Sequence, residues 1–154
     1  MKKTLFACLF STTLLFPFAA SAQAPLVRFD SGIGAIPLRA GGTPNTVRGV
    51  NPGGVPWVIS RLTADIKTDG RISVDGRGLL LAGGDGIGTN GNQSVRARLF
   101  CGSVMSDSVL VPLEPNGDFS IDGSLAPVPP NPCTNPVLLI VNTGNAWFAA
   151  GILK

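Results

Sequence analysis

An eight-residue pattern that recurs 47 residues further along the chain constrains the fold more than any other feature of the sequence. Residues 69–76 read DGRISVDG, and residues 116–123 read NGDFSIDG. In both copies apolar and polar side chains alternate directly after an Asp-Gly or Asn-Gly pair, which is typical of a β-strand that leaves a tight turn. The two copies therefore predict a protein built from antiparallel hairpins.

The alternation on either side of each turn predicts its length. A three-residue turn at residues 68–70 or 115–117 brings apolar side chains opposite one another, whereas a two-residue turn puts them on opposite faces. The predicted pairs are Ile66–Ile72 and Ala64–Val74 around the first turn, and Leu113–Phe119 and Val111–Ile121 around the second. Gly70 and Gly117 then take the left-handed position that ends this kind of turn.

Other apolar segments also have the pattern of strands. Residues 94–101 alternate, residues 137–141 form the continuous apolar run of a central strand, and a turn at 143–145 leads into 146–152. The chain contains 20 Gly and 13 Pro residues, which interrupt helices. We therefore expect an all-β protein: an antiparallel β-sandwich of the immunoglobulin-like or Greek-key type, made of two similar hairpin-plus-strand units.

The first 22 residues have the pattern of a cleaved signal peptide of bacterial appearance. Lys2 and Lys3 precede the apolar stretch 5–20, and the small residues 20–22 provide a cleavage site before Gln23. We expect residues 23–56, which are rich in Gly, Pro and Asn, to be a loose segment that wraps the core or supplies edge strands. Residues 57–154 are expected to form the core, and the mature protein to be secreted or periplasmic.

Removal of this segment changes the charge and the cysteine count. The net charge falls from +3 to about +1, and the remaining chain has no Lys/Arg cluster for nucleic acid or for stable membrane association. Cys8 is lost with the signal, so that Cys101 and Cys133 are left. An even number of cysteines in an exported chain predicts a disulfide between them.

The residue types limit the chemistry. The chain has no His, which excludes Ser-His-Asp and Cys-His catalysis. Residues 86–91 match G-x-G-x-x-G, but a strand follows where a dinucleotide site needs a helix. Asp85 is the only carboxylate in this loop, too few for calcium. We therefore expect a non-enzymatic protein without metal or cofactor.

Two groups of carboxylates offer alternatives to this interpretation. Asp30-Ser31-Gly32 resembles the active-site loop of aspartic peptidases, and a retropepsin-like homodimer would pair two Asp30 carboxylates that share one proton. Asp75 and Asp122, related by the repeat, have the residue types of a glycosidase pair, but each precedes a Gly at a strand end, where Asp commonly accepts hydrogen bonds from turn amides.

The candidate interaction residues lie outside these groups. Trp57 and Trp147 would bind a sugar or a protein partner if exposed, and would belong to the core if buried. Asp85, Asn90 and Asn92 provide polar groups in the Gly-rich loop 83–93. We expect an exported binding or structural module whose partner is an extracytoplasmic protein or carbohydrate, with the aspartic peptidase as the alternative.

Overall fold

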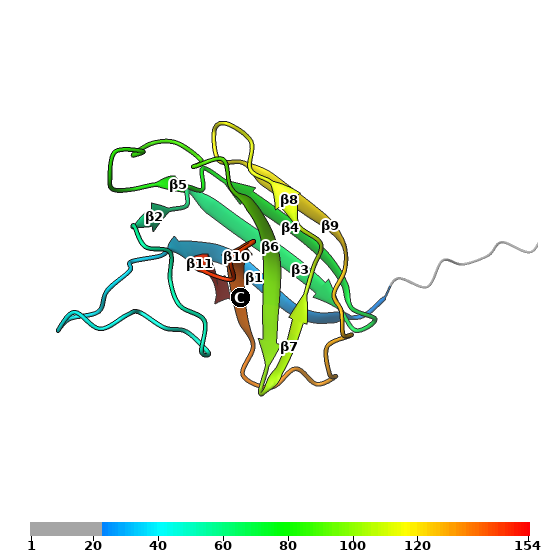
Figure 1. The fold of residues 1–154 in the computed structure, drawn as a ribbon. Coiled ribbons are helices and arrows are strands. Elements are labelled where there is room, and N and C mark those ends of the chain that lie inside the picture. The colour runs from blue at the N-terminus through cyan, green and yellow to red at the C-terminus, as the bar shows by residue number, and fades with distance from the viewer. Residues whose placement is uncertain (1–22) are drawn as a thin grey trace, which may run out of the picture.

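The computed structural model describes residues 23–154, and all of its regular elements are β-strands (Figure 1). The strands are β1 (Pro25–Gly34), β2 (Trp57–Val58), β3 (Arg61–Lys67), β4 (Arg71–Arg77), β5 (Leu80–Leu81), β6 (Ser94–Cys101), β7 (Val104–Asp107), β8 (Val111–Pro112), β9 (Phe119–Ser124), β10 (Val137–Asn142) and β11 (Trp147–Leu153). All pairs of named strands are antiparallel. The expected all-β, antiparallel class is confirmed. Within residues 23–154, no helix is long and apolar enough to span a membrane.

The main sheet is one strongly curled half-barrel, which corrects the expected two-sheet sandwich. Its strands follow the order β7-β6-β10-β11-β1-β3-β4-β9, and β8 pairs with β6. An isolated bridge between Asp107 and Ala126 brings the two ends of the sheet together. Alternation could not separate the two architectures, because a curled sheet and a pair of facing sheets both bury one side of each strand.

The N-terminal strand lies inside the sheet; we expected residues 23–56 either to wrap the core or to supply edge strands. β1 pairs with β11 on one side and with β3 on the other. Val27 and Phe29 are buried, whereas Arg28 and Asp30 point outward. The register with β11 shifts between Phe29 and Ser31, so that Asp30 is the extra residue of a β-bulge.

The remainder of this segment, residues 35–56, is bound to the start of β11. The Trp147 indole N–H donates to the Asn45 carbonyl over 3.0 Å, and Gly53 donates its backbone N–H to the Trp147 carbonyl over 3.0 Å. Val50 belongs to the same buried cluster as Trp147. These contacts place residues 45–53 around the buried Trp147 side chain at the start of β11.

The two predicted hairpins have different outcomes. The first is confirmed in its register, with Ala64 opposite Val74 and Ile66 opposite Ile72. The second turn also forms, but its strands separate: β8 pairs with β6, and β9 pairs with β4. The predicted pairs Leu113–Phe119 and Val111–Ile121 are therefore wrong, because β6 and β4 provide alternative partners for both strands.

The predicted disulfide between Cys101 and Cys133 is present and joins the end of β6 to the loop before β10. On the outer face of β6, Arg98 is buried and donates two hydrogen bonds of 2.7 Å to the Asp107 carboxylate. These hydrogen bonds raise the pKa of Arg98, against the opposing effect of burial. Arg98 and Arg96 both also donate to the Asn145 side chain, so that the turn after β10 is held against β6.

Candidate functional site

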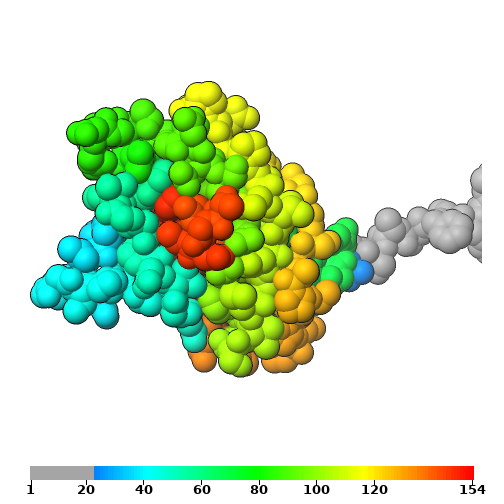
Figure 2. Space-filling view, in the orientation of Figure 1, coloured from blue at the N-terminus to red at the C-terminus, as the bar shows by residue number. Residues whose placement is uncertain are grey.

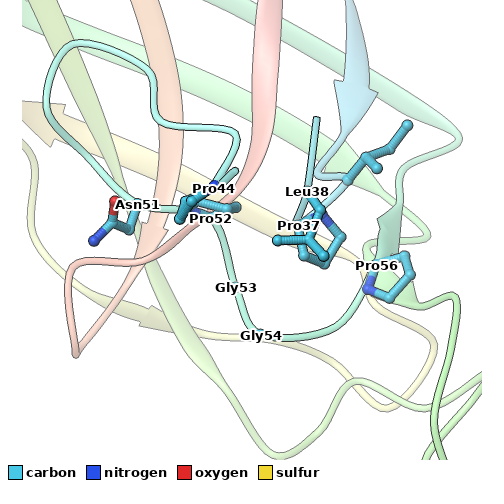
Figure 3. Close-up of a pocket in the computed structure, with 9 residues that line it drawn as sticks. Pro37, Leu38, Pro44, Asn51, Pro52, Gly53, Gly54 and Pro56 are labelled. Atoms are coloured by element: carbon cyan, nitrogen blue, oxygen red, sulfur yellow. The ribbon is translucent and has the colours of Figure 1, made fainter. Parts of the chain in front are cut away.

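A surface groove in residues 36–56 is the most apolar hollow among the described residues, and Figure 3 shows how its walls are arranged. We call it the proline-lined groove. It has a volume of about 520 Å³ and is lined by Ile36, Pro37, Leu38, Pro44, Asn51, Pro52, Gly53, Gly54 and Pro56. Segments 36–44 and 51–56 form its two walls, on the part of the molecule that projects at the left of Figures 1 and 2.

Backbone hydrogen bonds hold the two walls in place. Asn45 donates its N–H to the Pro37 carbonyl over 2.9 Å, and Arg39 donates to Thr43 over 2.8 Å, so that the first wall forms a short hairpin-like arm. The second wall is tied to the sheet through Gly53, whose position only Gly can occupy without rearrangement: a Cβ there would lie 2.9 Å from the Phe148 ring and 3.0 Å from the Trp57 indole nitrogen. The four prolines further restrict the backbone. The groove is therefore formed before any ligand arrives.

Two large apolar side chains at this groove are open to solvent. Ile36 is 63% exposed and Leu38 is 56% exposed. A cluster of exposed apolar side chains beside a concave surface is typical of a binding site, because covering them releases water and stabilises a complex. Chemically, the groove can hold an apolar group, but it has no acid, base or nucleophile among its lining residues.

The charges around the groove are mainly positive. Arg39 and Arg48 lie in the segment that forms it, and Arg61 starts β3 beside the Gly34 end of β1. None of these three arginines forms an ion pair within residues 23–154, whereas the other cationic side chains of this range all do. Asp85 is the nearby carboxylate, in the loop that contacts Pro56.

A second hollow, on the outer face of β1, β3 and β4, collects carboxylates. Asp30, Asp65 and Asp75 line it together with Arg28 and Lys154, in a volume of about 300 Å³. Each of the three carboxylates is ion-paired, including Asp30 with Lys154 over 3.0 Å.

The carboxylates of this second hollow are held by cations and do not have the environment of a general acid. Burial alone would raise the pKa of Asp65, but hydrogen bonds from Lys67 and Arg28 outweigh burial and lower it. A general acid needs the opposite shift. The peptidase hypothesis requires Asp30 to lie in a loop after a strand. Asp30 instead lies at the bulge inside β1. In the described part of the chain, no three His, Cys, Asp or Glu side chains are placed to hold a metal ion.

The structure separates the residues that the sequence singled out. Trp57 and Trp147 are buried, and Trp57 stacks on Phe148 with 4.0 Å between ring centroids. Asn90 donates two hydrogen bonds to the carbonyls of residues 113 and 114, and its carbonyl oxygen accepts from the backbone N–H of Asn92. Both asparagines therefore shape the Gly-rich loop.

Sequence reasoning missed the proline-lined groove. A signal was present, because four prolines and several aliphatic residues occur between positions 36 and 56. It was not decisive, because the same composition also describes an ordinary connecting loop. Comparison of the chain with protein-family models, with curated proteins and with solved structures gave no match.

Proposed function

We propose that this protein is an exported, non-enzymatic binding module and that its proline-lined groove receives an apolar segment of another polypeptide. The observation that carries the proposal is the pre-formed groove with Ile36 and Leu38 exposed at its wall. The proposal keeps the sequence-based expectation of a signal peptide and of a secreted or periplasmic location.

A polypeptide fits the described surface better than a carbohydrate does. Sugar-binding surfaces commonly use exposed aromatic rings as stacking platforms. All aromatic side chains of residues 23–154 are buried: Phe29, Trp57, Phe100, Phe119, Trp147 and Phe148. The exposed side chains at the groove are aliphatic, and aliphatic groups pack well against the apolar side chains of a protein.

Site-specific photo-crosslinking in the cells that produce the protein tests this proposal. A photoreactive side chain is placed at Leu38 and, as a control, at Val128, which is 58% exposed and lies beside Gly70 at the opposite end of β1 and β3. We expect polypeptide adducts from position 38 that disappear when Ile36→Asp is added. The same adducts from position 128, or none from position 38, would overturn the proposal.

A further inference from the structure

The Gly-rich loop 83–93 presents an apolar side chain on a defined projection. Ile87 stands between two glycines and is 65% exposed. The loop is not a loose connection, because Gly88 donates to the Leu81 carbonyl over 2.8 Å and Leu81 donates to the Thr89 carbonyl over 2.9 Å. These hydrogen bonds hold the Ile87 side chain outward, with most of its surface exposed to solvent.

The charges of this loop are opposite to those of the groove. Among the described Asp and Glu side chains, Asp85, Glu114 and Asp122 form no ion pair. Asp122 accepts hydrogen bonds from two serines. Asp85 belongs to the Gly-rich loop, and Glu114 adjoins it through the hydrogen bond from Asn90. The molecule thus carries an exposed isoleucine beside carboxylates that form no ion pair, and an apolar groove beside Arg39, which follows Leu38 and forms no ion pair. The Arg48 side chain instead donates to the Asn135 carbonyl over 3.0 Å.

The two features lie next to each other. Ala82 donates its N–H to the carbonyl of Pro56, a residue of the groove, and a Cβ on Gly83 would lie 3.0 Å from the Pro56 ring. Figures 1 and 2 show both loops projecting on the same side of the molecule, the Gly-rich loop in green and the groove segment in cyan. When two complementary features are adjacent on one face, a two-fold rotation places each of them on its counterpart in the second copy.

We infer that the occupant of the proline-lined groove is a second copy of this chain, which inserts Ile87 into the groove and places Asp85 near Arg39. The interface is reciprocal, so that each copy supplies one Gly-rich loop and one groove. This inference rests on the proposed function, because it names the polypeptide that the groove binds.

Analytical ultracentrifugation of the purified exported protein tests the inference through charge reversal. In the Asp85→Arg variant arginines face arginines, and in the Arg39→Asp variant carboxylates face carboxylates. We expect each variant alone to dissociate, with the dimer Kd raised by about tenfold or more. An equimolar mixture of the two variants restores opposite charges at both contacts, and should return the Kd to within about threefold of the unaltered protein.

A comparison of Leu38→Asp with Val128→Asp distinguishes the effect of a charge in the groove from the effect of a charge elsewhere on the surface. Leu38→Asp should weaken the dimer, and Val128→Asp should leave it unchanged. A protein that stays monomeric at about 1 mM, or a mixture of charge variants that fails to associate, would overturn the inference. If the protein is monomeric while position 38 still crosslinks to a different polypeptide, only the inference fails. If position 38 gives no adduct, both the inference and the proposed function fail.

Discussion

The turn at residues 67–71 and the turn at residues 114–118 share a sequence pattern and a local geometry, but they connect different structures. In both, the Gly N–H donates to the carbonyl three residues earlier, over 3.0 Å to Lys67 and 2.8 Å to Glu114. Gly70 and Gly117 have φ values of 86° and 82°. The first turn joins two strands that pair over their whole length, whereas the second joins β8 to β9, which pair with other strands.

The pairing of β4 with β9 shows what the repeat itself contributes. Val74 and Ile121 are equivalent residues of the two copies, and they lie directly opposite each other. Gly76 is paired with Phe119, and Ile72 with Gly123, so that the two copies meet around a local two-fold axis. The repeated strand therefore pairs with its own copy.

The strand before the second turn is held elsewhere. Pro112 has no N–H for a ladder with β9, and Leu113 donates to the Gln93 carbonyl over 2.9 Å. The second turn is held as well, because Leu79 donates to the Gly117 carbonyl over 2.9 Å. The comparison shows that a short pattern can determine a turn while the surrounding chain selects the partners of its strands.

Alanine at the two turn glycines tests the first contrast between the repeats, and Gly117→Ala has the largest single effect that we expect. Both positions have positive φ, which disfavours Ala by about 1–2 kcal/mol. At Gly70 a Cβ would meet only side chains at 3.4 Å, whereas at Gly117 it would lie 2.6–2.8 Å from the Leu79 backbone. We expect Gly117→Ala to lower the free energy of unfolding by about 3 kcal/mol, and Gly70→Ala by about 1 kcal/mol. Urea denaturation measures both; equal losses would contradict the assigned role of the Leu79 contact.

A second contrast concerns the equivalent glycines Gly76 and Gly123. A Cβ on Gly76 would lie 2.1 Å from the buried Phe119 ring, but a Cβ on Gly123 would meet nothing within 4 Å. We expect Gly76→Ala to destabilise the fold by about 2 kcal/mol through overpacking. Gly123→Ala should be neutral or stabilise it by about 0.5 kcal/mol. The midpoint of thermal unfolding distinguishes them, and a destabilised Gly123→Ala protein would argue against the local two-fold arrangement.

The smallest contrast is electrostatic. A hydrogen bond from the Gly78 N–H, followed by one from Arg77, lowers the pKa of Asp118. Desolvation would raise the pKa of Asp69, but hydrogen bonds from its neighbour Arg71 lower it. The pKa of each carboxylate is lower in the folded protein than in the unfolded chain. Both carboxylates therefore stabilise the fold at pH values above the ordinary pKa of Asp. This stabilisation disappears as the pH falls through the folded-state pKa.

Unfolding midpoints measured between pH 7 and pH 2 test this difference. Asp118 connects its turn to Gly78 of another segment, whereas Asp69 bonds only within its own turn. We expect Asp118→Asn to lower the unfolding midpoint at pH 7 and to make the decrease of the midpoint between pH 7 and pH 2 smaller. Asp69→Asn should change the midpoint and its pH dependence less. A larger effect of Asp69→Asn would show that local turn contacts outweigh the link between segments.

Much of the strand content could be predicted because it depends on local patterns. The alternation in residues 94–101, the apolar run at 137–141 and the Gly-containing turns all correspond to observed elements. The Cys101–Cys133 pairing could be predicted because the expected removal of a signal peptide would leave two cysteines. The candidate site could not be predicted in this way. Neither the exposure of Ile36 and Leu38 nor the burial of Trp57 and Trp147 follows from the residues next to them in the sequence.

By itself, the sequence determined which segments extend, where the chain turns, and which chemistry the absence of His excludes. Only the tertiary structure decided that β1 lies inside one curled sheet, that β8 pairs with β6, and that residues 35–56 bind the start of β11 while forming a groove. The physical reason is range. Turn and strand preferences act over a few residues, whereas strand partners and exposure depend on the packing of segments that are distant in sequence.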